Sequence, residues 1–293
     1  MAEEIFRNSE ALARQHGLEP EVARRYIAFE RFASRLQPDI LGFNWLIKGG
    51  YALSRWLGPT VRPTADLDLS LPNAGRLEYC MTPRLQLLIQ DARPDGFSFA
   101  FAGEPERLAP DAYADGAAYG RHRHSVTCSM EGKPFSSFDV DVDFGDKLVE
   151  PPAKLPAFAS GELLTIPVAA QWAEKIHACT MRETKDHAFL ARHAADARAL
   201  FVLGLPGVDA AAKAVYNTFT LRRQQTVPAS LPEWLIDSTS MDSYWATLLS
   251  TLEGLKRDDW NLRAEQLKVC NSVPWSADPE MMRRYFYSDS GLP

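Results

Sequence analysis

The sequence predicts an α+β protein with strands and helices in its first half and helices alone in its second. Three observations support this class. Segments typical of strands occur between residues 43 and 144, with helical segments among them. A proline-rich segment follows at 149–167, and beyond it the apolar residues recur at helical spacing. We therefore expect residues 1–150 to form a first lobe, 151–166 a linker and 167–293 a helical lobe.

Composition describes an ordinary globular protein of 293 residues, with 46% hydrophobic and 24% charged residues. The formal net charge of −6 excludes a basic nucleic-acid coat, so any RNA binding must use a local basic patch. The four cysteines form no close pair and no metal-ligand spacing, which indicates buried thiols in a reducing compartment. No secretory segment and no run near the ~20 apolar residues of a membrane span are present. We therefore expect a cytoplasmic protein with no membrane partner.

The first elements in chain order are helical. Residues 1–19 predict a short helix and turn, and Glu21–Leu36 predicts an amphipathic helix whose arginines face solvent. Phe43–Lys48 predicts a buried strand, and Gly49–Leu57 a second helix that ends at Gly58-Pro59. The strand and helix lead directly into the part of the chain that carries the chemistry.

The next predicted strand carries Asp66 and Asp68. Successive side chains of a strand point to opposite faces, so the two carboxylates share one face and the leucines between them pack inward. Two adjacent carboxylates repel each other unless a cation lies between them, and hard oxygen ligands suit Mg²⁺. Gly49 and Gly50, at the start of a helix, offer backbone N–H groups to an anion. A phosphate site beside a metal-binding carboxylate pair indicates phosphoryl or nucleotidyl transfer.

The rest of the first lobe predicts a helix at Arg76–Asp91, a strand at Phe97–Phe101 and a hairpin of His124–Met130 with Phe135–Phe144. The last strand places three aspartates on one face: Asp139, Asp141 and Asp143. Exposure at a sheet edge would also explain them. The presence of a second aspartate-bearing strand favours a third carboxylate that completes a two-metal site and acts as a base.

Helices are predicted beyond the linker at Val168–Met181 and Asp186–Val202, and then at 206–220, 241–256, 258–270 and 278–287. Lys175 lies beside the apolar stripe of the first of these helices. It either runs its stem along the edge of the core or points its ammonium at a nucleotide triphosphate. A turn at Arg182–Lys185 would bring Lys175 and Asp196 to the same side of a helix pair, although Asp196 could also form a surface ion pair.

These motifs together resemble the AbiEii/AbiGii branch of the DNA polymerase β-like nucleotidyltransferases, the toxins of type IV toxin–antitoxin systems, including the mycobacterial group that acts on tRNA. The matching segments are KGGYALSRWLGPTVRPTADLD at Lys48–Asp68, FDVDVDF at Phe138–Phe144, AEKIHACT around Lys175, and RHAADARAL around Asp196. The resemblance implies a polymerase β-like lobe, a mixed sheet with helices, joined to a helical C-terminal lobe with the active site in the cleft between them.

The resemblance also implies roles for single residues. Asp66, Asp68 and Asp141 match the metal-binding carboxylates, with Asp139 and Asp143 as alternatives for the third. Catalytic roles extend to Lys175 and Asp196, although Asp186 is a rival for the acid of the second lobe. The residues expected to bind the nucleotide are Lys48, Gly49, Gly50, Arg62, Thr64 and Lys175. Two Mg²⁺ ions are the expected cofactors, with Mn²⁺ as an alternative.

The function implied by the resemblance is transfer of nucleotides from a nucleoside triphosphate to the 3′ end of tRNA, with release of pyrophosphate. Such a toxin would block translation and growth, and a cognate antitoxin would neutralise it. Candidate RNA contacts are Arg121, His122, Arg123, His124 and the Arg24–Arg35 helix. The alternatives are transfer to a protein hydroxyl or a small molecule, and a catalytically silent binding module.

Overall fold

The computed structural model describes residues 2–36, 44–58, 63–72, 78–90, 93–112, 118–144, 148, 150–156, 162–180, 186–205, 207–222, 225–236 and 239–257. Its helices are α1 (Ala2–His16), α2 (Pro20–Arg35), α3 (Gly49–Leu57), α4 (Glu78–Ile89), α5 (Val168–Thr180), α6 (His187–Leu203), α7 (Val208–Tyr216) and α8 (Thr239–Arg257), with a π-helical turn η2 (Asn217–Arg222). Its strands are β1 (Leu46–Lys48), β2 (Asp66–Leu71), β3 (Phe97–Phe101), β4 (Glu106–Ala112), β5 (Ala118–Met130), β6 (Lys133–Phe144), β7 (Ala153–Pro156) and β8 (Glu162–Thr165).

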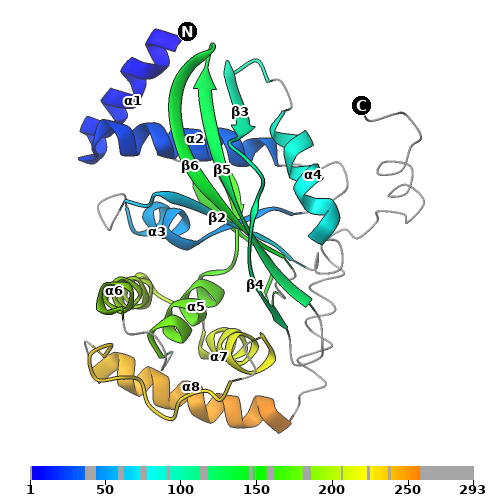
Figure 1. The fold of residues 1–293 in the computed structure, drawn as a ribbon. Helices are drawn as coiled ribbons and strands as arrows, with labels where there is room; N and C mark the ends of the chain where they lie inside the picture. Colours follow the sequence, from blue (N-terminus) through cyan, green and yellow to red (C-terminus); the bar gives the residue numbers. More distant parts are fainter. Residues whose placement is uncertain are drawn as a thin grey trace.

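The described strands form one mixed sheet in the order β3-β5-β6-β2-β1-β8-β7, with β4 pairing with β5 beyond the end of β3 (Figure 1). The β5–β6 hairpin is long and antiparallel, whereas β6 pairs with β2 in parallel. β1 lies antiparallel to β2 and parallel to β8. The two aspartate-bearing strands, far apart in sequence, are therefore direct neighbours in the centre of the sheet.

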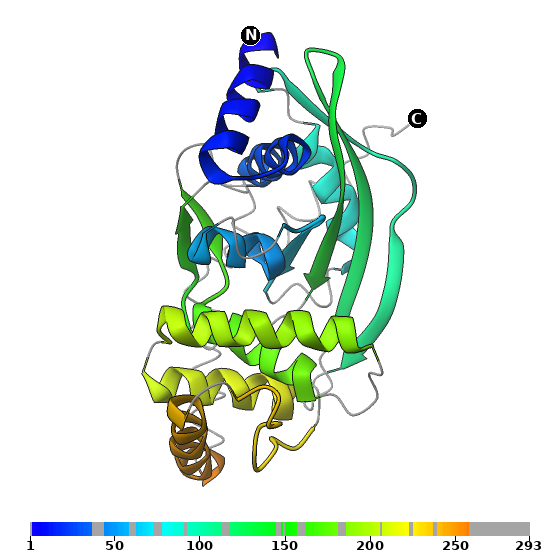
Figure 2. The same cartoon turned by 90° about the vertical axis from the view of Figure 1, so that its left-hand side faces the viewer.

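Two large apolar clusters, and a small third one of Leu46, Leu148 and Ile166, are present among the described residues. In the first, α2 lies across the apolar face of the sheet, where Phe29 packs edge-on against Phe138 and Phe32 against Phe99. α1 packs on α2, and α4 lies beside β3 (Figure 1). The second cluster joins α5, α6, α7 and α8 around Trp172 and Trp245. These helices stack beneath the sheet in Figure 2. α3 contributes Leu53 to this second cluster, so it joins the two parts.

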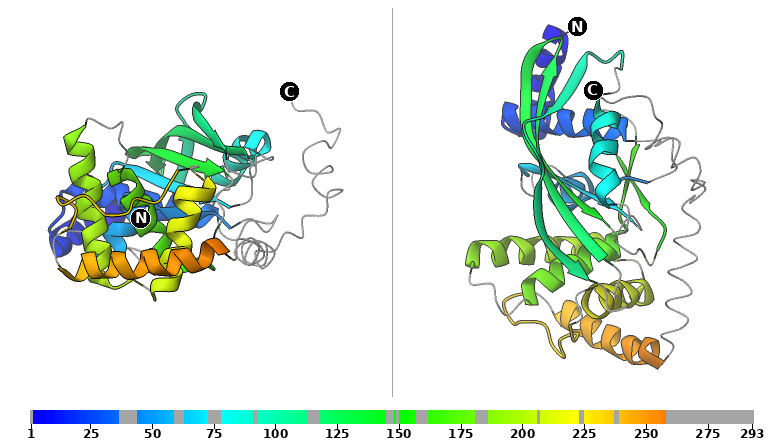
Figure 3. Two further views of the ribbon diagram at one scale, coloured as in Figure 1. Left: turned by 90° about the horizontal axis from the view of Figure 1, so that it is seen from below. Right: turned by 45° about the vertical axis from the view of Figure 1, so that its right-hand side comes forward.

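The predicted class, a mixed sheet with helices followed by a helical part, is confirmed. The bounds of α3 and β3 agree with the sequence pattern, and α4, α5, α6 and the β5–β6 hairpin lie where they are expected. β4, β7 and β8 were not predicted, and β7 and β8 fall within the expected linker of residues 151–166. Both strands pair at the β1 edge of the sheet (Figure 3, right). The helices expected at 258–270 and 278–287 lie outside the described residues, and the lobe boundaries stay a prediction.

Candidate active site

The candidate active site is built on one face of three neighbouring strands. Strand alternation places Asp66 and Asp68 on the same face of β2, as the sequence predicts. The parallel register sets Asp66 opposite Asp139 and Asp68 opposite Asp141. On β1, the other neighbour of β2 in the sheet, Lys48 is the cross-strand partner of Asp68. We call this surface of β2 and β6 the acid face.

Cationic side chains from the neighbouring strands hold the carboxylates of the acid face. Arg123 of β5 binds Asp141 in a bidentate manner, because its Nε donates to Oδ1 at 2.7 Å and its Nη2 to Oδ2 at 2.8 Å. Arg121 Nη2 donates to the same Oδ2 at 2.5 Å and lies 3.5 Å from Asp68 Oδ1. Lys48 forms a buried ion pair with Asp143. The cluster is therefore partly neutralised by the chain itself.

Asp68 on β2 and Asp141 on β6 differ in the pKa of their carboxyl groups. Burial, followed by the negative charge of Asp66, raises the pKa of Asp68 to about 6. Burial also opposes ionisation of Asp141, but the hydrogen bond from Arg123 and the charges of both arginines outweigh it and lower its pKa. Asp66 and Asp68 thus repel each other, and a bound divalent metal ion would offset this repulsion. The oxygens of Asp141, in contrast, already accept hydrogen bonds from the two arginines.

Gly49 brings the start of α3 against the acid face. Its φ of +67° is a left-handed conformation that glycine adopts readily. A Cβ at this position would lie 1.8 Å from Asp68 Oδ2, and a Cβ on Gly50 would lie 2.6 Å from Thr64 Oγ1. Neighbouring side chains therefore leave no room for a Cβ at either position, and the positive φ of Gly49 favours glycine there as well. Together they place the N-terminus of α3 beside the carboxylate pair.

Thr64 is held from three directions just before β2. Its Oγ1 donates to Asp66 Oδ1 at 2.6 Å and is largely buried. From α2, the Tyr26 hydroxyl accepts the Thr64 N–H at 3.3 Å and Arg25 Nη1 donates to the Thr64 carbonyl at 3.4 Å. The sequence pattern assigned the arginines of α2 to solvent and missed this positioning role, because an arginine on an amphipathic helix gives no signal of its target.

Lys175 and Asp196 meet in the helical part of the molecule, as expected for one side of a helix pair. Lys175 Nζ lies 3.0 Å from Asp196 Oδ2, and the two side chains are only 8% and 1% exposed. The alternative of a surface ion pair is therefore wrong. Asp186, the rival acid, caps α6 by accepting the N–H groups of Ala188 and Phe189 at 2.9 and 3.1 Å.

A hydrogen bond joins the helical part to the glycine turn. The Gly49 N–H donates to Gln171 Oε1 at 3.1 Å, and Gln171 lies one helical turn before Lys175 on α5. Residues four apart on a helix share a face, so Lys175 lies on the side of α5 that faces the N-terminal end of α3. The sequence carried no signal for Gln171, because a glutamine within an apolar helix segment is not distinctive.

Two of the expected RNA contacts are wrong. His124 is 1% exposed and stacks at 4.7 Å from Phe101, and burial together with the neighbouring His122 lowers its pKa to about 4. Arg35 is also buried, where it binds Asp95 and the carbonyl of Phe97. Alternation along β5 explains the first error, since it sends the histidines to the apolar face and the arginines to the acid face. Arg62 lies outside the described residues.

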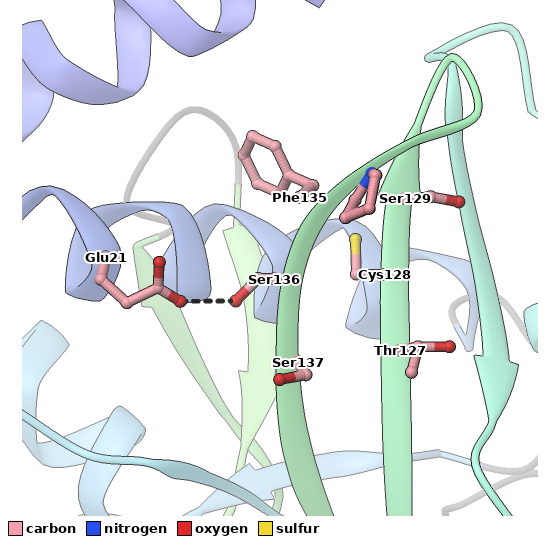
Figure 4. A pocket seen from close by; sticks show the side chains of 8 residues that line it. Glu21, Thr127, Cys128, Ser129, Phe135, Ser136 and Ser137 are labelled. Carbon is pink, nitrogen blue, oxygen red and sulfur yellow. Dashed lines mark hydrogen bonds between the residues drawn. The ribbon is translucent and has the colours of Figure 1, made fainter.

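A pocket of about 530 Å³ lies away from the acid face, between α2 and the tip of the β5–β6 hairpin (Figure 4). Hydroxyl side chains make up half of its lining, together with Cys128, Pro134, Phe135 and Glu21, and Ser136 Oγ donates to Glu21 Oε1 at 3.5 Å. It lacks the paired carboxylates and cations of nucleotide chemistry. The cleft expected between the two lobes stays a prediction.

The acid face is not a ready-made metal cage. Within the described ranges, no group of three or more histidine, cysteine, aspartate or glutamate side chains is arranged to hold a metal ion together. The register explains this, since Arg121 and Arg123 occupy the oxygens of Asp141 that would complete the set with Asp66 and Asp68.

Among the described residues, no helix is both long and apolar enough to cross a membrane.

A mixed sheet with a carboxylate pair beside a glycine-opened helix is the arrangement expected of a nucleotidyltransferase. The particular family follows from comparison with known proteins. The family model described as nucleotidyl transferase AbiEii toxin, type IV toxin–antitoxin system, matches residues 31–271, and the chain belongs to this family. A search of the curated proteins finds no match.

Similar solved structures are distant. An antigenic nucleotidyltransferase-like protein from Paracoccidioides brasiliensis shares 14% identity and a TM-score of 0.39, over 82% of this chain and 89% of that one. The Megavirus polyadenylate synthase shares 10% identity and a TM-score of 0.33, over 65% of this chain and 35% of that one. The identification therefore depends on the family match.

Proposed function

We propose that the chain is a toxin that transfers nucleotides from a nucleoside triphosphate to the 3′ end of tRNA, releases pyrophosphate, and so blocks translation and growth. The observation that carries this proposal is the Asp66 and Asp68 pair beside the Gly49 turn, joined through Gln171 to the helix of Lys175. The tRNA acceptor is supported by the resemblance of the motifs to the tRNA-modifying toxins. Membership of a type IV family implies a cognate antitoxin as partner.

Asp66 and Asp68 would hold Mg²⁺, or Mn²⁺, with Asp141 as the proposed third ligand of a two-metal site. The bound metal would supply positive charge to the phosphates while the leaving pyrophosphate develops negative charge. The N-terminal N–H groups of α3 after Gly49 would bind a phosphate. Lys175, held by Asp196, would provide a point charge for the triphosphate. Lys48, paired with Asp143, would act indirectly by fixing the backbone before the turn.

Asp141 and Thr64 have narrower proposed roles. A carboxylate offers about four acceptor sites, and the arginines use three of those of Asp141. The remaining site would orient the acceptor hydroxyl, and Asp141 would have to exchange a hydrogen bond from an arginine for the metal ion in order to act as the third ligand. The lowered pKa of Asp141 makes it a weak base, so positioning is its main contribution. Thr64 would orient Asp66 through its hydroxyl.

The test is a transfer assay with the full chain, each of the four α-labelled ribonucleoside triphosphates, Mg²⁺ and total tRNA. We expect label at the 3′ end of tRNA, and none when the tRNA has been oxidised with periodate, which destroys its terminal diol. Asp66→Asn should abolish labelling, whereas Asp209→Asn, at an exposed carboxylate of α7, should not. Label on protein alone would favour the protein-hydroxyl alternative, and label nowhere would contradict nucleotidyl transfer.

A further inference from the structure

We propose that Gln171 is a positioning residue that holds the glycine turn in its nucleotide-binding conformation and docks the Lys175 helix beside it. Gln171 lies in the first turns of α5 and is 2% exposed. Its Oε1 accepts the Gly49 N–H at 3.1 Å, across 122 residues of sequence. This inference rests on the proposed nucleotidyl transfer, because it concerns the same site.

The glycine turn needs an external constraint. Glycine has more conformational freedom than any other residue, yet Gly49 must keep its φ of +67° to remain against Asp68 Oδ2. The bond to Gln171 supplies this constraint from another part of the fold. It also occupies the Gly49 N–H, so the N–H groups that follow it in the first turn of α3 are the ones left for a phosphate.

The same bond fixes α5 relative to the acid face. Lys175 follows Gln171 by one helical turn, and its ammonium is already aimed by the ion pair with Asp196. A hydrogen bond at Gln171 therefore sets where this cation lies along the triphosphate. One side chain thus links the anion site, the metal carboxylates and the lysine.

Stability alone does not account for a glutamine at this position. Its Nε2 is buried and has no hydrogen-bond partner among the described residues. A methionine of similar length would remove this unpaired amide group, which offsets the cost of leaving the Gly49 N–H without its acceptor, so the net cost to the folded state is small. The benefit of Gln171 is expected in nucleotide binding, where a preorganised turn spares the ligand the cost of ordering it.

The test compares Gln171→Met with the wild-type chain. Loss of one neutral hydrogen bond should raise KM for the nucleoside triphosphate about fivefold. The value of kcat should change less than about twofold, since the bond acts on ground state and transition state alike. The melting temperature should change little, because loss of the unpaired amide offsets loss of the bond to Gly49. Amide exchange at Gly49 should become faster in the nucleotide-free protein.

Gln225→Met is the matched control. Gln225 Oε1 lies 3.0 Å from His177 Nε2, so this variant also removes a glutamine hydrogen bond to the α5 region, but away from the glycine turn. It should leave KM unchanged. An unchanged KM in Gln171→Met, or an equal loss of kcat accompanied by a lower melting temperature, would overturn the positioning role.

Calorimetric titration with each of the four ribonucleoside triphosphates and Mg²⁺ separates this inference from the proposed function. Nucleotide binding requires no acceptor. If the wild type binds one nucleotide and Gln171→Met binds it equally well, only the Gln171 inference fails. If the wild type binds none of the four, nucleotidyl transfer itself fails, and the Gln171 inference with it.

Discussion

The acid face and the Lys175–Asp196 pair are both charge clusters, but they are built differently. On the acid face, Asp66 and Asp68 are partly exposed, carboxylates outnumber cations, and the pKa of Asp68 is raised. In the helical part, one cation meets one anion at 3.0 Å and both are buried. An unbalanced, reachable cluster can bind a metal, whereas a balanced, buried one keeps its geometry. The difference predicts opposite responses to the same kind of substitution.

The largest effect is expected on the acid face. Asp66→Asn removes a proposed metal ligand, so transfer activity should fall about a thousandfold or more. Stability should not fall, because one of two mutually repelling carboxylates is lost. Activity assays together with urea unfolding measure both. An active variant would mean that the metal site lies elsewhere.

Asp196→Ala should act mainly on stability. It leaves the Lys175 ammonium buried without its partner, which costs about 3–5 kcal/mol in comparable pairs. Urea unfolding measures this loss. The double variant Lys175→Met with Asp196→Leu should recover much of the stability without any activity. A stable, active Asp196→Ala protein would contradict the balanced-pair description.

Gly49→Ala should have an intermediate effect. Its Cβ would overlap Asp68 Oδ2, so the turn or the carboxylate must move, and the left-handed backbone adds a cost of about 1–3 kcal/mol. Gly58→Ala is the control, because Gly58 also has a positive φ but no described atom lies within 4 Å of the position that its new methyl group would take. Equal loss of activity in both variants would show that strain, not contact with Asp68, is responsible.

The smallest effect concerns two buried thiols, one in each of the two large apolar clusters. Burial raises the pKa of Cys128 and of Cys179 to about 12, so both should react slowly with iodoacetamide at pH 8. In Asp196→Ala, Cys179 should react several times faster while Cys128 does not change. Mass spectrometry of labelled peptides measures the two rates, and parallel acceleration would indicate that the two parts open together.

The parts of the site that follow from strand alternation could be predicted from the sequence. Asp66, Asp68 and the acidic stripe of β6 lie on one face because every second side chain of a strand points to the same face. The parallel register of β2 and β6 could not be predicted, since a long intervening segment sets it. Arg121 and Arg123 were expected to contact RNA because the predicted strand began only at His124, so their pairing with β6 across the hairpin, where they bind Asp141, was missed.

Helical positions were harder to interpret than strand positions. Lys175 and Asp196 could be paired because both lie near one turn, but burial of Asp196 depends on how α5 and α6 pack. The contributions of Arg25 and Gln171 depend on partners 39 and 122 residues away. The short strands β7 and β8 gave too few residues for a period, and prolines around them indicated a linker.

The arginines of the acid face act as built-in counterions, and this has a consequence for the order of binding. A magnesium–nucleotide complex brings a cation for the carboxylates and an anion for Arg121 and Arg123. Exchange of partners would then leave the local charge nearly constant, so that no charge becomes uncompensated in a partly buried place. A metal ion that binds alone would instead displace an arginine from its carboxylate without supplying a new anion for that arginine. We therefore expect metal and nucleotide to enter together.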